Sequence, residues 1–251
     1  MSGERAVIRI GLAGWSEAVS RYRASFPRHG QVAPDASALG KYATAFDFVE
    51  VNASFYRQFR PATYEKWASE VPSGFCFSVK MHRLITHYTR LKNATLLGPF
   101  FDSIGGLGDK LGVVLIQLPP SLPFDEAIAA PFLRAFREHY DGAAVCEPRH
   151  ASWTDSAASG LLADYRIGLV RTDIPDPRCE EEAGGAPLYL RLHGAPRRYY
   201  SAYSDEQLGR LAAYLRLNPQ RARFVVFDNT ASNAAMANAS TLRELVGGSA
   251  S

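Results

Sequence analysis

Eight short runs rich in apolar and β-branched residues recur along this chain, and helical stretches separate most of them. The runs are Val7–Leu12, Phe46–Val51, Phe75–Lys80, Leu111–Leu118, Ala143–Glu147, Ile167–Asp173, Leu188–His193 and Arg223–Asp228. Several, such as VVLIQL and RFVVFD, are almost wholly apolar, as strands covered on both faces are. The amphipathic stretches are Ala36–Ala45, Ala62–Glu70, Leu91–Ile104, Asp125–His139, Asp155–Tyr165, Asp205–Leu217 and Thr230–Leu245. This alternation predicts an α/β fold, a single parallel eight-stranded β/α barrel of the TIM type.

The chain length agrees with one such barrel, because 251 residues is close to the usual size of this fold. The alternative is a doubly wound open sheet. That fold is expected to carry a Gly-rich phosphate fingerprint after its first strand, and GLAGW does not match GxGxxG. No linker divides the chain, so we expect one domain over residues 1–251, with 246–251 as a frayed tail.

Composition favours a soluble globular protein, with 47% hydrophobic and 21% charged residues. No apolar run reaches the roughly 18 residues that a membrane-spanning helix needs. The start, MSGERAVIRIGLAGW, has no signal-peptide pattern. Of three cysteines, Cys76 and Cys146 lie inside apolar runs and are interpreted as small core residues. The sequence therefore predicts a cytoplasmic protein with no membrane partner.

Charged or amide side chains stand at the carboxyl ends of seven of the eight predicted strands. In a β/α barrel these ends surround the active site. The catalytic candidates are Glu50, Lys80, Glu147, His193 and Asp228. The candidates for substrate binding are Trp15, Asn52, Tyr56, His82, Gln117, Arg149, His150, Trp153, Asp173, Arg191, Arg197, Arg198, Tyr203 and Asn229. Taken singly, each could cap a loop or face water, but a ring of buried charges is costly unless its members are paired or bind something.

Seven sequence stretches in a fixed order carry a family resemblance that runs almost end to end. They are GLAGW, FVEVNASFY, FCFSVKMHRLITHYTRL, LGVVLIQLPPS, EPRHASW, YLRLHG and FDNTASNAAMANASTL. On these stretches the chain resembles the YecE-like family, domain of unknown function 72. The resemblance implies a β/α-barrel fold and marks the residues above, but it supplies no reaction. It also implies a hydroxyl residue where this chain has Ala13 and an Asn where it has Asp228, so one ligand contact is absent and one charge is added.

Basic residues gather in the loops that follow the predicted strands. Loops 13–34, 52–60, 81–92, 148–153, 174–186 and 194–203 hold twelve basic and five acidic residues, a balance of +7. The loops that precede the strands, 41–47, 69–74, 102–110, 139–142, 164–166 and 218–223, hold five basic and six acidic residues, a balance of −1. A basic mouth attracts anions, and arginine forms two-point pairs with phosphate or carboxylate. The same loops contain aromatic residues that are able to stack bases or sugars unless they pack on the rim.

These features favour an enzyme that acts on an anionic, phosphate-containing substrate, with hydrolase or phosphodiesterase-like chemistry. Glu50, Glu147 and Asp228 are then acid/base groups or metal ligands, and His193 carries protons or binds the metal. Lys80 would neutralise developing negative charge or act as a nucleophile. The alternative is a non-catalytic protein that binds a nucleotide or nucleic acid through its basic mouth.

A second alternative is a carbohydrate-active enzyme with paired carboxylates and Trp153 as its sugar platform, which leaves the basic mouth unexplained. HExxH, G-x-S-x-G and P-loop patterns are all missing from the sequence. A divalent metal fits the residue types, but no spacing signals one. Substrate, reaction, cofactor and oligomeric state are therefore not given by the sequence.

Glu147 is the strongest single catalytic candidate. Pro148 follows it and restricts the backbone of Glu147 to an extended shape, which directs the carboxylate. Arg149 and His150 come next, so positive charge is close by in the sequence. A nearby cation favours the ionised carboxylate that a base or ligand role requires.

Overall fold

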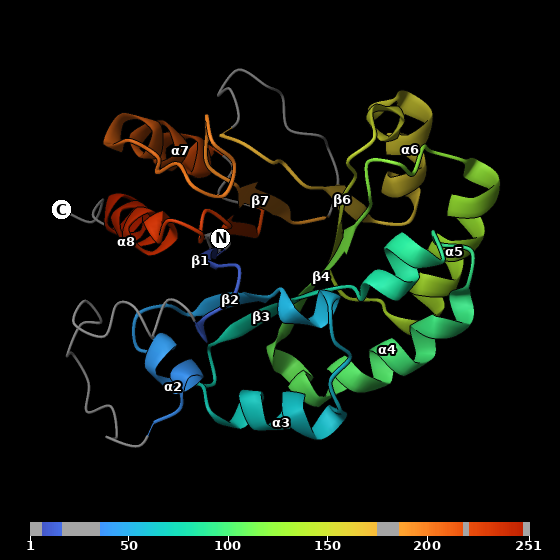
Figure 1. Ribbon diagram of the computed structural model, residues 1–251, viewed down its shortest axis with the longest axis horizontal. Helices are drawn as coiled ribbons and strands as arrows, with labels where there is room; N and C mark the ends of the chain where they lie inside the picture. Colours follow the sequence, from blue (N-terminus) through green and yellow to red (C-terminus); the bar gives the residue numbers. More distant parts are fainter. Residues whose placement is uncertain (1–6, 17–35, 175–185, 218–220, 248–251) are drawn as a thin grey trace, which may run out of the picture. The chain divides into compact units, whose positions relative to one another are not determined.

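The computed structural model describes residues 7–16, 36–174, 186–217 and 221–247 (Figure 1). The chain divides into two compact units. The first holds residues 1–50, 171–183 and 187–251, and the second holds residues 51–170 and 184–186. The expectation of one domain stays a prediction.

A parallel three-stranded sheet with the order β1-β8-β7 forms the centre of the first unit. Its strands are β1 (Ile8–Leu12), β7 (Leu188–Leu192) and β8 (Arg223–Phe227), and its helices are α2 (Ala38–Tyr42), α7 (Asp205–Leu217) and α8 (Ala234–Gly247). Helix α8 packs on β1 and β8, and α7 lies beside α8 (Figure 1). All five residues of β7 and of β8 are buried, which agrees with their nearly continuous apolar sequence.

A glycine allows the chain to approach closely at β1. A Cβ atom built on Gly11 would lie 2.1 Å from the carbonyl oxygen of Phe48. The buried hydroxyl of Tyr42 lies at the same place, where it accepts a hydrogen bond from Leu12 N at 3.0 Å and donates one to Phe48 O at 2.8 Å. Burial raises the pKa of this phenol well above its usual range. Tyr42 therefore satisfies two backbone groups at the end of α2.

The second sheet is also parallel, with the order β2-β3-β4-β5-β6. Its strands are β2 (Phe48–Val51), β3 (Cys76–Lys80), β4 (Leu111–Gln117), β5 (Ala144–Glu147) and β6 (Ile167–Leu169). The boundary between the units falls inside β2, so Val51 begins the second unit. The helices of that unit are α3 (Pro61–Ser69), α4 (Leu97–Ile104), α5 (Glu126–His139) and α6 (Ser156–Asp164), with short turns η1 (Ala53–Phe55), η2 (Leu84–Tyr88), η3 (Ala94–Leu96), η4 (Gly105–Lys110) and η5 (Ala151–Thr154).

Local capping explains where two of the helices begin. The side chain of Asp125 accepts a hydrogen bond from Ala127 N at 3.0 Å and caps α5. At α7, Ser204 Oγ accepts from Gln207 N at 3.3 Å while Gln207 Oε1 accepts from Ser204 N at 2.9 Å. This reciprocal pair is a capping box, and it places Ser204 at the start of the helix.

All eight predicted strands exist and pair in parallel, so the α/β class is confirmed. Among the described residues they hydrogen-bond as two sheets of three and five strands, where one closed sheet was predicted. Strand β6 ends at Leu169, short of the predicted Asp173. The reason is a change of partner: Val170 N donates to Cys146 O in β5, but the backbone of Arg171 then pairs with Tyr189 and Arg191 in β7.

Cys76 and Cys146 are buried free thiols, as expected of small core residues. Burial, with a smaller contribution from the charge of Glu147, raises the pKa of the Cys146 thiol far above its usual value. Cys179 lies outside the described residues. Within the described part of the chain, no helix is both long enough and apolar enough to cross a bilayer.

Candidate functional site

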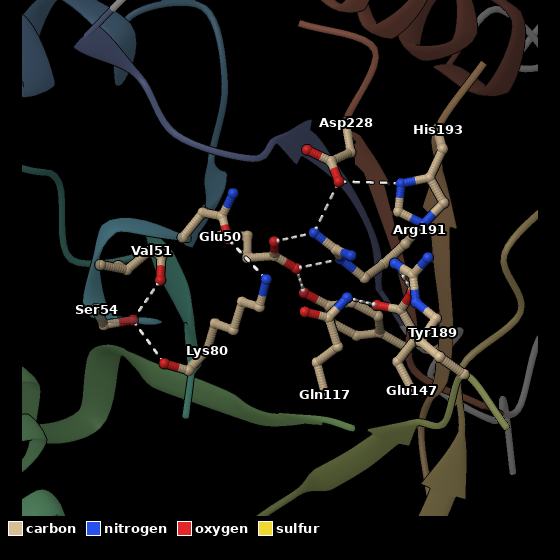
Figure 2. Close-up of polar contacts among 12 residues, drawn as sticks. Glu50, Val51, Ser54, Lys80, Gln117, Glu147, Tyr189, Arg191, His193 and Asp228 are labelled. Carbon is tan, nitrogen blue, oxygen red and sulfur yellow. Dashed lines mark hydrogen bonds and ion pairs between the residues drawn. The ribbon is translucent and has the colours of Figure 1, made fainter. Parts of the chain in front are cut away.

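The guanidinium of Arg191 is the centre of a polar group in the first unit, at the carboxyl ends of β2, β7 and β8 (Figure 2). Its Nε donates to Oε2 of Glu50 at 3.0 Å, and its Nη2 donates to Oε1 at 2.8 Å. The Arg191 side chain is 1% exposed and the Glu50 side chain 0%. This two-point match of a planar cation and a carboxylate is among the strongest hydrogen-bonded pairs in proteins, so each side chain fixes the other.

Tyr189 supplies a third hydrogen bond to Glu50. Its hydroxyl donates to Oε2 at 2.9 Å. Tyr189 and Arg191 are two residues apart on β7, so their side chains lie on the same face of the strand. Both oxygens of Glu50 therefore accept hydrogen bonds from β7. This arrangement suits Glu50 to holding Arg191 in place rather than to accepting a proton from a substrate.

Arg191 also binds Asp228, and Asp228 binds His193. The Nη2 of Arg191 donates to Oδ2 of Asp228 at 3.0 Å, and Nδ1 of His193 lies 3.0 Å from the same oxygen. The four side chains thus form one continuous chain from Glu50 through Arg191 and Asp228 to His193 (Figure 2). The side chains of Asp228 and His193 are 10% and 5% exposed, slightly more than the buried pair behind them.

The contact with Asp228 decides what His193 can do chemically. A carboxylate next to Nδ1 favours the tautomer with its proton on Nδ1, which makes Nε2 the proton-accepting nitrogen. The three charged partners together carry one negative charge, so a proton taken up by His193 makes the group neutral. The arrangement therefore favours the imidazolium that forms when His193 acts as a base.

Lys80 ends β3 in the second unit, and its charged side chain is buried (Figure 2). Its Nζ donates to Asn52 Oδ1 at 3.1 Å and lies 4.2 Å from the centre of the Phe55 ring. The hydroxyl oxygen of Ser54 lies 2.5 Å from Val51 O and 2.7 Å from Lys80 O, so its single proton is shared between two carbonyl groups and links η1 to β3. Lys80 is thus held between an amide and an aromatic face.

His87 shares this environment. Its ring meets Phe55 edge to face at 4.8 Å, and its Nδ1 lies 2.9 Å from Thr86 Oγ1. Burial, and secondarily the charge of Lys80, lower the pKa of His87 below its ordinary value of 6.5. His87 is therefore neutral at neutral pH, and the cation in contact with the Phe55 ring is Lys80.

Glu147 ends β5 with its side chain fully buried. Its Oε1 pairs with the guanidinium of Arg149, and its Oε2 accepts a long hydrogen bond from Gln117 Nε2 at 3.4 Å (Figure 2). Gln117 stands opposite Glu147 in the register of β4 and β5. Arg149, the cation expected near Glu147 from the sequence, is therefore in contact with this carboxylate.

Comparison with known proteins identifies the family. The model of the family described as "Protein of unknown function DUF72" matches residues 9–251. The chain belongs to this family. The resemblance inferred from the seven sequence stretches is thereby confirmed.

Relatives of this DUF72 chain match it over nearly its whole length. The UPF0759 protein YunF of Bacillus subtilis (strain 168) is 26% identical, over 96% of this chain and 95% of the relative. The crystal structure of a DUF72 family protein from Thermotoga maritima MSB8 superposes with a TM-score of 0.78 at 24% identity, covering 96% of this chain and 99% of the other. A DUF72 family protein from Enterococcus faecalis V583 gives 0.76 at 19% identity, with 96% of each chain covered. These structural likenesses show the fold.

Several residues predicted to bind substrate have structural contacts in this DUF72 protein. Trp153 is 2% exposed, and its Nε1 donates to Leu122 O at 3.0 Å, so its ring belongs to the core. His150 Nδ1 accepts from Ser152 N at 3.2 Å and caps η5. His82 Nδ1 accepts from Leu84 N at 3.1 Å at the start of η2.

Tyr203 and Asn229 hold the loop that follows β7. The Tyr203 hydroxyl accepts from Gly194 N at 2.9 Å, and burial raises the pKa of this phenol to about 12. Asn229 Nδ2 donates to Ser201 O and to Asn238 Oδ1, each at 3.0 Å. Both side chains are buried, so they shape the loop from within.

Other predicted site residues face solvent. Arg197 lies 3.9 Å above the ring of Tyr200, and Arg198 lies 5.2 Å from that of Tyr199. Asp173 is exposed, and its side chain accepts a hydrogen bond from the backbone N–H of the next residue, Ile174. Tyr56 is exposed, and Trp15 is partly buried. Arg21, Arg23, Arg28 and Arg178 of the basic loops lie outside the described residues.

The structure thus brings Glu50, Arg191, His193 and Asp228 together in one unit. Their convergence with Lys80 and Glu147 in one pocket stays a prediction. Sequence reasoning missed Tyr189, although the alternation Tyr-x-Arg-x-His in YLRLH signals three side chains on one strand face. In the described ranges, no three His, Cys, Asp or Glu side chains gather as metal ligands would.

Proposed function

We propose that this DUF72 protein is an enzyme that acts on an anionic, phosphate-bearing substrate by acid–base chemistry, with His193 transferring the proton. The observation that carries the proposal is the contact of 3.0 Å between His193 Nδ1 and Asp228 Oδ2. The same carboxylate oxygen also accepts a hydrogen bond from Arg191. A carboxylate in this position orients the imidazole and stabilises its protonated form. Glu50 and Tyr189 then contribute indirectly, because Glu50 holds Arg191 in position and Tyr189 binds Glu50.

The charge of the loops supports an anionic substrate. The loops after the strands carry a balance of +7 against −1 for the loops before them. Such an asymmetry steers anions toward one end of a sheet. Arg197 and Arg198 are exposed in the loop that begins directly after His193, and arginine binds phosphate through two hydrogen bonds.

Glu147 and Lys80 are the candidates for the remaining roles. Glu147 is a buried carboxylate held by Arg149 and Gln117, which suits a second acid/base group or a metal ligand. Lys80 is a buried cation that would stabilise negative charge developing on a phosphoryl or alkoxide oxygen.

We further propose that the eight strands close into one β/α barrel. Isolated parallel bridges join Ala13 to Glu50 and Arg171 to Leu190. These are the places where a closed barrel would continue from β1 to β2 and from β6 to β7. A closed barrel would present the carboxyl ends of all strands on one face, where enzymes of this fold carry their active sites.

Turnover of phosphate compounds by His193 variants tests the proposed function. The purified protein is assayed against phosphodiesters, phosphomonoesters and sugar phosphates, and His193→Gln and Asp228→Asn are compared with wild type on each compound. We expect both variants to fold and to lose turnover by about 100-fold or more, the usual scale for a general acid or base. Arg134→Ala, an exposed change on α5, is the control. Unchanged turnover in His193→Gln, or wild-type protein that binds phosphate compounds but converts none of them, would contradict the proposal.

A further inference from the structure

We infer that the loops after β2 and β3 form a binding surface for single-stranded nucleic acid, in which the rings of Tyr56 and Tyr88 stack on bases. The two rings flank the guanidinium of Arg83, and these three residues are called the Tyr56–Arg83–Tyr88 platform. All of them lie in the second unit. The inference does not depend on the proposed enzymatic function, because its evidence and its test involve binding alone.

The geometry of the platform is that of a stacking surface. Arg83 Cζ lies 5.5 Å from the centre of the Tyr56 ring and 5.4 Å from that of Tyr88. The two tyrosines are 60% and 63% exposed, whereas most aromatic residues in the described part of the chain are buried. Exposed aromatic rings beside arginine offer π-faces on which any base can stack.

The platform rests on packed and hydrogen-bonded structure. Phe55 is buried and meets Tyr56 edge to face at 4.9 Å. The segment Leu84–Tyr88 forms a π-helical turn, closed by a hydrogen bond of 2.9 Å from Thr89 N to Leu84 O. Arg83 and Tyr88 stand at the two ends of this turn, and the distance of 5.4 Å between the Arg83 guanidinium and the Tyr88 ring shows that the turn brings them together.

The far end of the η2 loop is also fixed. Arg90 and Leu91 have φ angles of 52° and 66°, a left-handed conformation that side chains other than glycine rarely adopt. Arg90 donates from Nη2 to Ser121 O at 2.6 Å and from Nη1 to Ser121 Oγ at 3.2 Å. Conformations of this kind persist only where the surroundings fix them, and they cluster at ligand sites. A platform held in this way loses little conformational entropy on binding.

The charge of the two loops that carry the platform matches a polyanion. Residues 52–60 and 81–92 contain no Asp or Glu, and their basic residues are Arg57, Arg60, Arg83, Arg90 and Lys92. In the described part of the chain, Arg57, Arg60, Arg83 and Lys92 form no ion pair. Their charges are therefore available to phosphate groups. Nucleic-acid binding surfaces combine these two features, cationic side chains for the backbone and aromatic faces for the bases.

A single strand fits this surface better than a duplex. Bases in a duplex are already stacked on one another, so exposed tyrosine rings reach only bases that are unpaired. An acidic peptide would use the positive charge but would leave both rings without a stacking partner. Single-stranded DNA and RNA share the required chemistry, and the experiment separates them.

Fluorescence anisotropy of labelled oligothymidylate and oligouridylate with the full chain tests the inference, over salt concentrations from about 50 to 200 mM. We expect Tyr56→Ala and Tyr88→Ala each to weaken binding by about fivefold to 100-fold without a change in the salt dependence, since stacking is not ionic. Arg60→Ala is expected to reduce the slope of log affinity against log salt by about 0.7, the effect of one lost phosphate contact. Tyr88→Phe, which keeps the ring, should bind as wild type does, and so should the Arg134→Ala control.

Three results would overturn the inference. The first is no binding of either oligonucleotide at the lowest salt concentration. The second is equal affinity for wild type and the Tyr56→Ala/Tyr88→Ala double variant in a protein whose melting temperature is unchanged. The third is binding of a duplex, or of polyglutamate of equal charge, that is as tight as binding of the single strand. A difference between oligothymidylate and oligouridylate would identify which nucleic acid the surface prefers.

Discussion

Arg191 binds Glu50 through two hydrogen bonds of 3.0 and 2.8 Å, and water has almost no access to either side chain. Two buried ions stabilise a fold only as a matched pair, because each loses its hydration. Glu50 is shared between this pair and the Tyr189 hydroxyl, and Arg191 is shared with Asp228. Changes in this pair should therefore affect both stability and the orientation of His193.

Replacing Arg191 alone should destabilise the protein severely. Arg191→Met leaves Glu50 buried without its cation, and we expect a loss of about 3–5 kcal/mol in the free energy of unfolding. The double variant Glu50→Met/Arg191→Met should recover part of that loss, because Glu50 is then no longer a buried charge without a partner, while Asp228 still lacks its arginine. Urea denaturation measures both. Lys66→Ala, which breaks the exposed pair Lys66–Glu70, should cost about 1 kcal/mol or less and serves as control. A double variant as unstable as Arg191→Met would refute this account.

Glu147→Gln separates a catalytic from a structural role for Glu147. The amide keeps the size of the side chain and still accepts a hydrogen bond from Gln117 or Arg149. We expect a folded protein that binds its ligand and has lost turnover by about 100-fold or more. Melting temperature, ligand binding and turnover are measured together. A large fall in melting temperature with unchanged activity per folded molecule would assign Glu147 to the structure alone.

Phosphate should bind through the arginines of the loop after β7. The variant Arg197→Ala/Arg198→Ala is expected to weaken the binding of inorganic phosphate or a nucleotide by about tenfold or more, which corresponds to about 1.4 kcal/mol. Calorimetric titration at low and moderate salt checks this, and added salt should weaken wild-type binding by screening. Arg149→Ala is the companion variant, because Arg149 is also a predicted contact but pairs with Glu147. Binding that is missing at low salt, or that none of these changes alters, would exclude the loop as the phosphate site.

Stability should fall on mild acidification because of His82 and His87. Burial lowers the pKa of both, with smaller contributions from the charges of Arg83 and Lys80 respectively, below the ordinary value of 6.5. Below about pH 6.5 the unfolded chain therefore binds more protons than the folded one, and the free energy of unfolding decreases as pH falls. His82→Asn/His87→Asn should show a smaller decrease between about pH 7.5 and 5.5 in denaturation experiments. An identical pH dependence in variant and wild type would show that other groups cause it.

Gly11 should tolerate no side chain. A Cβ atom there would stand 2.1 Å from Phe48 O, so Gly11→Ala must displace backbone and should cost about 1–3 kcal/mol or more. Gly160 in α6 has no atom within 4 Å of an added Cβ, and Gly160→Ala should stabilise the protein by about 0.5–1 kcal/mol through the higher helix propensity of alanine. Thermal unfolding of the two variants gives the comparison. Equal effects of the two substitutions would contradict the close approach at β1.

The strands could be located from the sequence because burial on both faces leaves a continuous apolar run, as in β4 and β8. The end of β6 could not, because Arg171 and the residues after it continue in β-like sequence while the backbone changes its pairing partner to β7. How the strands are divided between sheets also depends on hydrogen bonds between distant segments, and no local pattern encodes those.

The grouping of Arg191, His193 and Asp228 could be predicted because each lies at or directly after the end of a strand. Arg191 and His193 followed from their position at a strand end, and Asp228 from the next strand in the sheet. Trp153 shows the opposite case: its sequence position suggested a platform, but its indole donates to Leu122 O inside the core. Whether an aromatic ring at a strand end turns inward depends on the space around it, as the exposed Tyr56 also illustrates.

The side chains of Tyr189 and Arg191 in β7, and of His193 directly after this strand, follow one another at regular intervals along the chain. Tyr189, Arg191 and His193 occupy alternate positions, so about 6.6 Å of extended backbone separates each from the next. Any substitution that keeps the strand preserves this spacing, but inserting or deleting one residue between Tyr189 and His193 would turn the imidazole to the opposite face of the sheet. An insertion or deletion in this segment should therefore disrupt the contacts among Glu50, Arg191, Asp228 and His193 more than a substitution does.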